Sequence, residues 1–274
     1  MTARYAVYFA PADHSPLAVF GQTLLSRTPD ELLTSHQASQ YLSQHLTNTD
    51  NLMPPDCAFL QRLVKTPRHY GFHATLKAPF ELAEGKTAAE LCTAVGRFAA
   101  QETPLTLTGL HPVVKSGFLA LRLLHQPDSV KAFAFRCVQQ FEAYRAPLSE
   151  YDIERRKPDT LSAHQRDNLM RYGYPHIKDA FDFHMTLSSR LSAGEADRTA
   201  NKPTDSVDTK PETRHTPLNE DQQDVAASEQ SAIGWIDALY KTLVPEDPVL
   251  DRVAVYYQPD RQSHFVRHFE ATLV

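Results

Sequence analysis

Two short stretches of the sequence share one pattern and decide how the rest of the chain is interpreted. Residues 70–77 read YGFHATLK and residues 181–188 read FDFHMTLS, so each contains Phe-His-x-Thr-Leu. By average residue usage, a histidine is followed by x-Thr-Leu less than about 1% of the time. Two such histidines among 13 therefore indicate an internal repeat rather than coincidence.

Each stretch has the pattern of a strand with one apolar and one polar face. Side chains alternate between the two faces of a strand, so the histidine and the threonine share one face and their apolar neighbours share the other. The residues predicted to share the polar faces are His73, Thr75, Lys77, His184, Thr186 and Ser188. We expect the two strands to lie side by side about a pseudo-twofold axis, so that both imidazoles line one groove.

Two opposed imidazoles suit acid–base hydrolysis of a phosphodiester. A pKa near 6.5 lets one histidine accept a proton from water or a ribose hydroxyl while the other protonates the leaving alkoxide. The Thr75 and Thr186 hydroxyls can donate to the non-bridging oxygens, and the Lys77 ammonium can add positive charge. We therefore predict His73, His184, Thr75 and Thr186 as catalytic residues. Which histidine is the acid stays open.

Residues that flank the two motifs are candidates for substrate binding. Arg68 and Tyr70 precede the first motif, and Arg171 and Tyr174 precede the second; an arginine fork is the expected anchor for a phosphorylated sugar. The predicted substrate-binding set is Lys77, Ser188, Arg68, Tyr70 and Tyr174. The basic run at 155–157 could meet a second phosphate, although a run of charges is usually a solvated face.

The sequence contains no pattern typical of a metal or nucleotide site. His69 and His73 are four residues apart, which would suit a metal on a helix, but Gly71 and the β-like flanks argue against a helix there. The cysteines form no CxxC pair, and neither GxGxxG nor GxxxxGK[ST] occurs. We therefore expect no metal, no cofactor and no ATP dependence.

Acidic residues are concentrated in one segment of the chain. Residues 191–230 contain nine acids and four bases, whereas the remainder balances at 24 of each. The segment has no aromatic residue and almost no large aliphatic one, so it predicts a disordered acidic insertion in a single domain of residues 1–190 and 231–274. A balanced domain argues against a long nucleic acid as partner, but not against a small phosphate ligand.

Strand-like and helix-like segments alternate along the rest of the chain. Strands are predicted at 4–10, 104–114, 117–124, 252–259 and 264–274, and helices at 15–27, 87–102 and 129–144. Strands in hairpins mixed with helices indicate an α+β domain. No apolar stretch approaches the roughly 20 residues of a membrane helix, and the N-terminus lacks a signal-peptide pattern. We expect a cytoplasmic protein without a membrane partner.

These residues resemble the 2H phosphoesterases, a superfamily defined by paired His-x-Thr/Ser motifs on two related lobes. The opening RYAVYFAP at 4–11, together with residues 67–80 and 171–188, is similar to a bacterial branch associated with phosphonate metabolism, DUF1045-like. The resemblance implies a bilobal α+β fold with two pseudo-twofold-related antiparallel sheets and flanking helices, no metal, and a small cyclic phosphate substrate. For this branch the implied candidate is 5-phosphoribosyl 1,2-cyclic phosphate.

Three functions are compatible with the sequence. The first is metal-independent hydrolysis of a small cyclic phosphodiester, a phosphorylated sugar or nucleotide. The second is processing of RNA ends, as a 2′,3′-cyclic phosphodiesterase or a 2′-5′ ligase-like enzyme; the balanced charge of the domain weakens it. The third is a non-catalytic phosphate-binding or interaction protein whose acidic insertion recruits a partner. The oligomeric state stays open.

Overall fold

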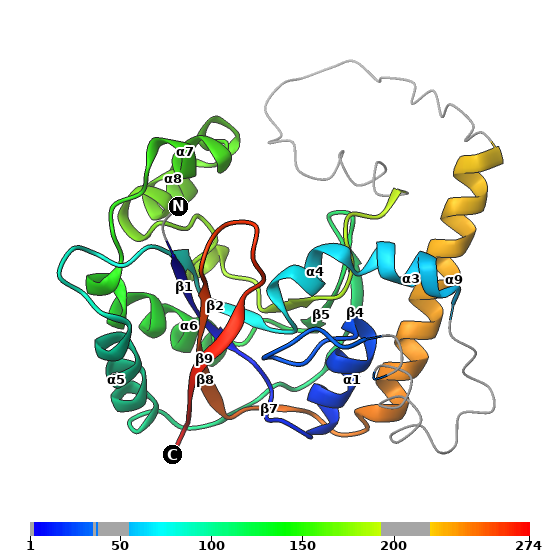
Figure 1. Ribbon diagram of the computed structural model, residues 1–274, viewed down its shortest axis with the longest axis horizontal. Helices are drawn as coiled ribbons and strands as arrows, with labels where there is room; N and C mark the ends of the chain where they lie inside the picture. Colours follow the sequence, from blue (N-terminus) through cyan, green and yellow to red (C-terminus); the bar gives the residue numbers. More distant parts are fainter. Residues whose placement is uncertain (1–2, 35–36, 38–54, 193–219) are drawn as a thin grey trace.

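A seven-stranded antiparallel sheet forms the centre of the molecule (Figure 1). The computed structural model describes residues 3–34, 37, 55–192 and 220–274. The sheet has the spatial order β4-β5-β6-β2-β1-β8-β9. In that order the strands span Leu110–Lys115, Phe118–Leu123, His184–Thr186, Ala74–Phe80, Arg4–Phe9, Arg252–Gln258 and Val266–Thr272. Strands β3 (Leu105–Thr106) and β7 (Val249–Leu250) pair with each other outside this sheet.

Strands β2 and β6 lie next to each other in the middle of the sheet, where Ala74 lies opposite Met185. On one side of this junction β5 and β4 form a hairpin, and on the other side β1, β8 and β9 continue the sheet. The predicted α+β fold with antiparallel strands is confirmed. The two expected sheets are the two halves of one sheet, which meet at β2 and β6.

Helices cover one face of the sheet and flank its edges. They are α1 Pro16–Leu25, α3 Cys57–Leu63, α4 Lys65–Tyr70, α5 Ala88–Ala99, α6 Asp128–Gln140, α7 Glu150–Arg155, α8 Ala163–Tyr172 and α9 Glu220–Leu243, with 3-10 turns η1 Glu142–Tyr144, η2 Pro158–Thr160 and η3 Lys178–Ala180. Thr87 caps α5 in a capping box with Glu90. In the described part of the chain, every helix is too short or too polar to span a bilayer.

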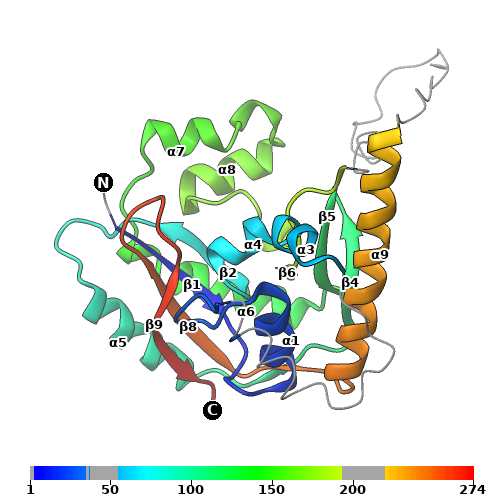
Figure 2. The ribbon, with the colours of Figure 1, turned by 45° about the vertical axis from the view of Figure 1, so that its right-hand side comes forward.

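The main hydrophobic core lies between one face of the sheet and helices α1, α5, α6 and α9. Val7 and Phe9 of β1 point into this core, whereas Tyr8 points to the opposite face and packs with Tyr256 and Phe265. Helix α9 runs beside β4 in both views (Figures 1 and 2), and the Tyr240 hydroxyl donates to the Leu110 carbonyl at 2.8 Å. The face of the sheet that carries Tyr8 is therefore separate from the helical layer.

The segment before the first histidine motif differs from the prediction. Its expected β-like flank is wrong, because residues 65–70 form α4, which ends at Gly71 with a φ of 85°. The Arg27 guanidinium donates to the carbonyls of Arg68 and His69 at the end of this helix. A contact with a residue so distant in sequence holds the helix end, and no local pattern signals such a contact.

The acidic insertion predicted at 191–230 falls mostly on residues 193–219, which lie outside the described residues. From Glu220 onward the chain is helical and continues as α9. The buried Glu229 carboxylate accepts from the Ser192 backbone N–H at 2.9 Å and from its hydroxyl at 2.6 Å. Residues 220–230 therefore belong to α9, unlike the predicted boundary at 230; Ser192 binds Glu229 in the middle of this helix, and the turns that follow pack into the main core.

Helix α1 packs so closely on the residue before His73 that Gly21 has no room for a side chain. A Cβ at Gly21 would lie 2.0 Å from the Phe72 ring, whereas a Cβ at Gly234 of α9 meets nothing within 4 Å. We expect Gly21→Ala to lower the free energy of unfolding by about 1–3 kcal/mol through overpacking. Gly234→Ala should leave it unchanged or raise it by up to about 1 kcal/mol. Urea denaturation measures both, and a Gly21→Ala variant as stable as the wild type would contradict this packing.

Candidate active site

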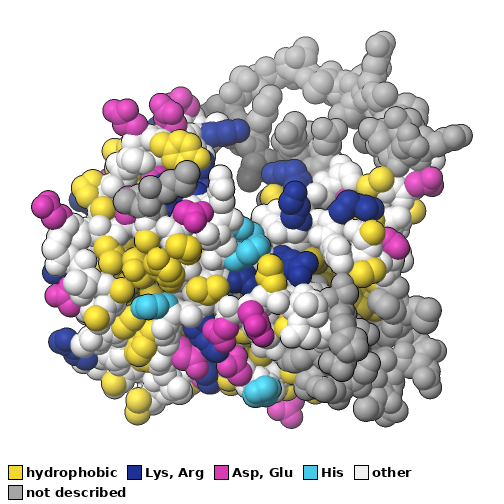
Figure 3. All heavy atoms as spheres, viewed as in Figure 1, with side chains coloured by type: hydrophobic (Ala, Val, Ile, Leu, Met, Phe, Trp, Pro, Cys, Tyr) yellow, Lys and Arg dark blue, Asp and Glu magenta, His cyan; other side chains and the backbone are white. Residues whose placement is uncertain are grey.

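Both histidine motifs contribute to one cavity of about 360 Å³ on the face of the sheet opposite the main core. The polar and aromatic side chains that line it come from both halves of the sheet, from α4 and from the segment between α6 and β6. They are Arg4, Tyr8, Thr66, Tyr70, His73, Thr75, Phe118, Arg122, Arg155, Arg156, Tyr174, His184 and Thr186. Histidine, lysine and arginine side chains also gather near the centre of the face in Figure 3, between the α7–α8 region and the α4 region.

The pairing of β2 with β6 positions the two motifs relative to each other. Ala74 lies opposite Met185, and both side chains are buried in the main core. Continuing this antiparallel register by one residue sets His73 across from Thr186 and His184 across from Thr75. Because neighbours in a strand alternate faces, all four polar side chains lie on the cavity side. The predicted groove with two imidazoles is thus present, and each histidine faces the threonine of the other motif.

The two imidazoles are held in the same way. His73 Nδ1 lies 2.8 Å from the Gly71 carbonyl oxygen, and His184 Nδ1 lies 2.7 Å from the Asp182 carbonyl oxygen. A carbonyl can only accept, so Nδ1 is the protonated nitrogen of each neutral ring and Nε2 keeps its lone pair. The Thr75 hydroxyl lies 3.3 Å from His73 Nε2 and can donate to it. Each motif therefore presents a basic nitrogen in the same tautomer.

Burial makes the neutral form of both histidines the stable one. Burial, with smaller contributions from the nearby His184 and Arg27, lowers the pKa of His73 to about 4, although the hydrogen bond to the Gly71 carbonyl acts in the opposite direction. Burial also lowers the pKa of His184, where the charge of Arg122 lowers it and that of Asp182 raises it. Both rings are therefore neutral at pH 7. An anionic phosphodiester beside them would stabilise their charged forms and raise both pKa values.

A second layer of residues fixes the histidine rings. Tyr8, which is fully buried, stacks on His73 with ring centroids 3.7 Å apart and an interplanar angle of 21°. On the other half of the sheet, Arg122 lies opposite His184 and forms an ion pair with the Asp182 carboxylate. Lys115 Nζ also contacts this carboxylate, at 3.0 Å. The Asp182 backbone that holds His184 is thereby tied to strands β4 and β5.

Tyr70 and Tyr174, both predicted to bind substrate, line the cavity. Tyr70 stacks on Phe265 at 5.5 Å and 22°. The Arg156 guanidinium carbon lies 4.8 Å from the centre of the Tyr174 ring, which also meets His176 edge-on. These contacts hold both tyrosines in defined positions at the cavity wall.

Lys77 does not reach the cavity, so its predicted role in substrate binding is corrected. Its side chain is 2% exposed, and its ammonium donates to Glu142 at 2.7 Å and to the Val138 carbonyl at 3.3 Å, beneath α6. The β1–β2 register shifts between Tyr8↔Thr75 and Val7↔Lys77. This β-bulge adds one residue to β2 and turns Lys77 to the core face, and Ala78 lines the cavity in its place.

Ser188 and Arg68 also lie outside the cavity. Ser188 is fully buried beyond the end of β6, and its hydroxyl accepts from the Leu119 backbone N–H at 2.9 Å. The Arg68 guanidinium points to the carbonyls of Ser26 and Leu33, each 3.4 Å away. Both residues therefore support the structure around the site, which corrects their predicted contact with substrate.

Several polar and aromatic cavity residues were absent from the predicted set, namely Arg4, Tyr8, Thr66, Phe118 and Arg122, while Arg155 and Arg156 were considered only as part of the basic run at 155–157. Arg4 and Tyr8 share a face of β1, so alternation in RYAVYFAP signals their common direction. It does not signal that β1 lies next to β2. Arg122 comes from β5, and Arg156 follows α7. Which strands and helices approach the motifs depends on sheet order, which local patterns do not encode.

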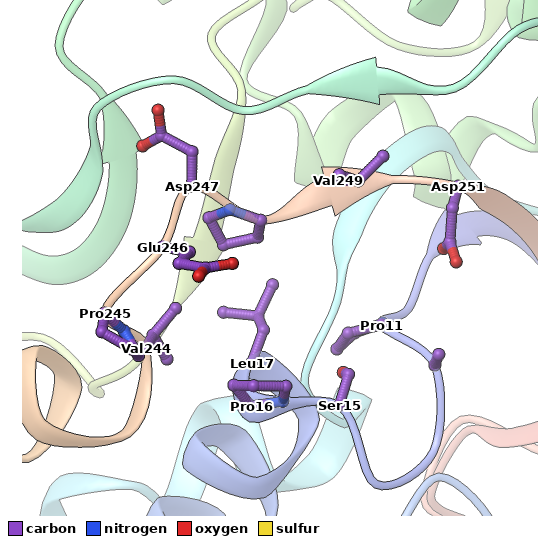
Figure 4. A pocket seen from close by; sticks show the side chains of 12 residues that line it. Pro11, Ser15, Pro16, Leu17, Val244, Pro245, Glu246, Asp247, Val249 and Asp251 are labelled. Atoms are coloured by element: carbon purple, nitrogen blue, oxygen red, sulfur yellow. The ribbon is translucent and has the colours of Figure 1, made fainter.

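A larger cavity of about 430 Å³ lies between the start of α1 and the chain that follows α9 (Figure 4). Leu17 points into it from α1, and residues 244–249 form the opposite wall. Its charged residues are Glu246, Asp247 and Asp251, and no basic side chain among the described residues lines it. Such a lining repels anions, so this cavity does not suit a phosphate ligand. Among the described residues, no group of three or more metal-ligating side chains is assembled.

Fold and site together define an α+β protein whose two central strands place a pair of histidines in one arginine-lined cavity. Residues 75–219 match the family described as "Protein of unknown function (DUF1045)". The match covers more than half of the chain, so the chain belongs to this family, and the predicted membership is confirmed.

Two curated relatives carry the name ribose 1,5-bisphosphate phosphokinase PhnN. The protein of Janthinobacterium sp. (strain Marseille) is 37% identical over 194 residues, which are 71% of this chain and 40% of the relative. The protein of Laribacter hongkongensis (strain HLHK9) is 30% identical over 188 residues, 69% of this chain and 40% of the relative. The chain thus corresponds to about 40% of the length of these relatives.

Solved structures show only a loose likeness. The crystal structure of E. coli LigT complexed with NADP+ aligns with a TM-score of 0.36 and 11% identity, over 100% of this chain and 99% of that chain. The conserved protein of unknown function ATU0111 from Agrobacterium tumefaciens aligns with a TM-score of 0.38 and 10% identity, over 98% and 86% of the two chains. Similarity at this level is too weak to transfer an activity.

The depressed pKa of His73 links folding to pH. In the unfolded chain the His73 imidazole takes up a proton near pH 6.5, whereas in the folded protein it does so only near pH 4. The stability that this histidine contributes is therefore complete above pH 6.5 and is lost as the pH falls toward 4. When the pH is lowered from 7 to 5, the free energy of unfolding should fall for both proteins. We expect the fall to be about 1–2 kcal/mol smaller for His73→Asn than for the wild type.

Urea denaturation at the two pH values measures this difference. His164→Asn, on the exposed surface of α8, serves as the control and should keep the wild-type dependence. If His73→Asn lost as much stability on acidification as the wild type, the buried neutral histidine would be the wrong description.

Proposed function

We propose that this chain is a metal-independent phosphodiesterase that hydrolyses a small cyclic phosphodiester, with His73 and His184 as the acid–base pair. The observation that carries the proposal is the pair of equivalent imidazoles, each holding Nδ1 on a backbone carbonyl and directing Nε2 away from it. Neutral, pre-oriented imidazoles next to arginines suit proton transfer around an anionic phosphorus centre.

In the proposed reaction His73 is the general base and His184 the general acid. His73 has the pKa of about 4 and so keeps its Nε2 lone pair at neutral pH, from which it removes a proton from the attacking water. His184 lies near the Asp182 carboxylate, whose charge favours the imidazolium, and the bound anion favours it further. As the new P–O bond forms, one ring P–O bond breaks, and the His184 Nε2 proton passes to the leaving alkoxide.

Hydroxyls and one arginine complete the proposed transition-state contacts. Thr75 and Thr186 line the cavity across from the two histidines and can donate to the non-bridging oxygens. Arg122 lines the same cavity from β5, opposite His184. Its fixed charge would offset the negative charge that grows on those oxygens. No step requires a metal ion.

The relatives support a phosphorylated ribose as the substrate. Their name designates a ribose bisphosphate, and more than half of their length lies outside the matched region. This chain has no GxxxxGK[ST] loop, so we propose for it a phosphoesterase step rather than the kinase step of that name. Within this class we propose 5-phosphoribosyl 1,2-cyclic phosphate, in phosphonate catabolism, as the candidate substrate.

Removal of either imidazole should abolish most of the turnover. With EDTA present, we expect His73→Ala and His184→Ala each to lower kcat on a ribose 1,2-cyclic phosphate by about 10²–10⁴-fold. His111→Ala is the matched control, because His111 Nδ1 bonds the Gly109 carbonyl at 2.8 Å in the same way but lies outside the cavity. Activity that survives both substitutions would overturn the two-histidine mechanism, and loss on chelation would overturn its metal independence.

The acid and base roles can be separated by the leaving group. A cyclic phosphodiester of catechol releases a phenolate, which needs far less protonation than an alkoxide. We expect this substrate to restore much of the activity of His184→Ala but little of that of His73→Ala, because only the base remains necessary. Steady-state kinetics with both esters measure the effect, and the reverse pattern would exchange the two roles.

A further inference from the structure

A smaller cavity of about 100 Å³ adjoins the histidine cavity. The two cavities share Arg4, Pro79, Arg155 and Arg156 in their linings. Arg4 begins β1, and Arg155 and Arg156 end α7, which lies with α8 near the N-terminal end of β1 (Figures 1 and 2). Arg4, Arg155 and Arg156 therefore lie between the histidine cavity and the smaller cavity.

Two of these guanidinium groups have no carboxylate partner in the described part of the chain. Arg4 is 6% exposed, and its Nε, at 2.9 Å, and its Nη2 both donate to the neutral Gln258 side-chain oxygen. Arg156 lies over the Tyr174 ring at 4.8 Å. In contrast, Arg122 pairs with Asp182, and Arg145 pairs with Glu142 at 2.6 Å. Arg4 and Arg156 thus carry positive charge that no described acidic side chain neutralises within 4.0 Å.

Uncompensated charge in such a place is costly to the folded protein. Burial lowers the pKa of Arg4, and the charges of Arg261 and Arg155 lower it further. Burial is also the main cause that lowers the pKa of Arg156. Taking a cation out of water without an anion beside it is unfavourable. A bound anion would recover that cost, so the arrangement favours a ligand with negative charge at this position.

The position differs from that of the reacting phosphorus. Tyr8 stacks on His73, and Arg4 lies on the same face of β1 four residues earlier, about 13 Å away along the strand. An arginine side chain reaches back over only part of this distance. An anion between Arg4 and Arg156 would therefore be a second group of the substrate, separated from the cyclic phosphate by the sugar.

We infer that Arg4 and Arg156, with Arg155 at the rim, bind a terminal phosphate monoester on the substrate of the histidine pair. The inference rests on the proposed function for the identity of the reacting group. A phosphate dianion matches two guanidinium forks better than a single carboxylate does, since each fork can donate two parallel hydrogen bonds. The subsite makes the enzyme selective for a phosphorylated sugar cyclic phosphate over its unphosphorylated counterpart.

Helix α7 positions part of this subsite through a contact with the β8–β9 connection. Ser149 caps the helix, and Asp152 within it accepts from Arg261 Nη2 at 3.0 Å with both carboxylate oxygens. Arg261 thus neutralises Asp152, which would otherwise compete with the ligand for Arg155, 3.9 Å away. This pairing leaves Arg156 and Arg4 available to an incoming anion.

The selectivity test compares ribose 1,2-cyclic phosphate with and without a 5-phosphate. We expect the wild type to have the higher kcat/KM on the phosphorylated ester, and Arg156→Gln and Arg4→Gln each to reduce the ratio of the two values by about 10–100-fold. Arg156→Lys should retain part of the preference. Arg97→Gln removes the same charge from the exposed side of α5 and should keep the wild-type ratio.

Binding of ribose 5-phosphate tests the subsite independently of turnover. Calorimetric titration should show weaker binding to Arg4→Gln and Arg156→Gln than to the wild type and Arg97→Gln, with thermal unfolding confirming that each variant is folded. Absence of hydrolysis with this binding pattern intact would overturn the proposed function and leave the subsite standing. Three results would overturn the subsite. They are a wild-type selectivity ratio near one, equal binding of ribose 5-phosphate by all variants, and a preference of the enzyme for a 2′,3′-cyclic dinucleotide.

Discussion

The antiparallel pairing of β2 with β6 is the constraint on which the site depends. Ala74 opposite Met185 fixes a register in which each histidine stands across from the threonine of the other motif. Because the side-chain period of a strand is two, a slip of one residue would send His73 and Thr75 into the hydrophobic core. The apolar residues of the motifs prevent this slip, since Ala74 and Met185 are each at most 1% exposed. Packing on one face thus sets the geometry of the two imidazoles on the other.

The backbone before each motif adds the second requirement, a defined tautomer. Gly71 ends α4 with a φ of 85°, a conformation that residues with a side chain rarely adopt, and its carbonyl accepts from His73 Nδ1. At the second motif Asp182 provides the equivalent carbonyl while its side chain is held by Arg122 and Lys115. Different local structures therefore lead to the same presentation of Nε2. Because His111 makes the same contact outside the cavity, it is the convergence of both rings on one cavity, together with this tautomer, that supports a shared role.

The local sequence pattern correctly predicted the site residues that lie on regular strands, but not the other residues of the site. Alternation correctly separated His73 and Thr75 from Ala74, and His184 and Thr186 from Met185. It failed at Lys77, where a bulge in β2 reverses the face, and at Ser188, which lies beyond the end of β6. A bulge depends on the partner strand, so the residues of β2 alone do not reveal it. Arg4 escaped prediction because sheet order brings it to the site, and the basic run at 155–157 could not be assigned to the site because the placement of α7 is not encoded locally.

The histidines and threonines lie on the central strands, whereas two of the arginines lie at the end of a helix. This difference bears on how the proposed substrate specificity arises. The histidines and threonines belong to the buried centre of the sheet, where a change of position would disturb core packing. Arg155 ends the short helix α7 and Arg156 follows it, and the Asp152–Arg261 pair holds this helix beside the sheet. In the proposed function the paired motifs carry out the reaction, whereas the proposed subsite around α7 selects the substituent on the substrate. Because the two sets of residues lie on different elements, we expect that they can vary independently.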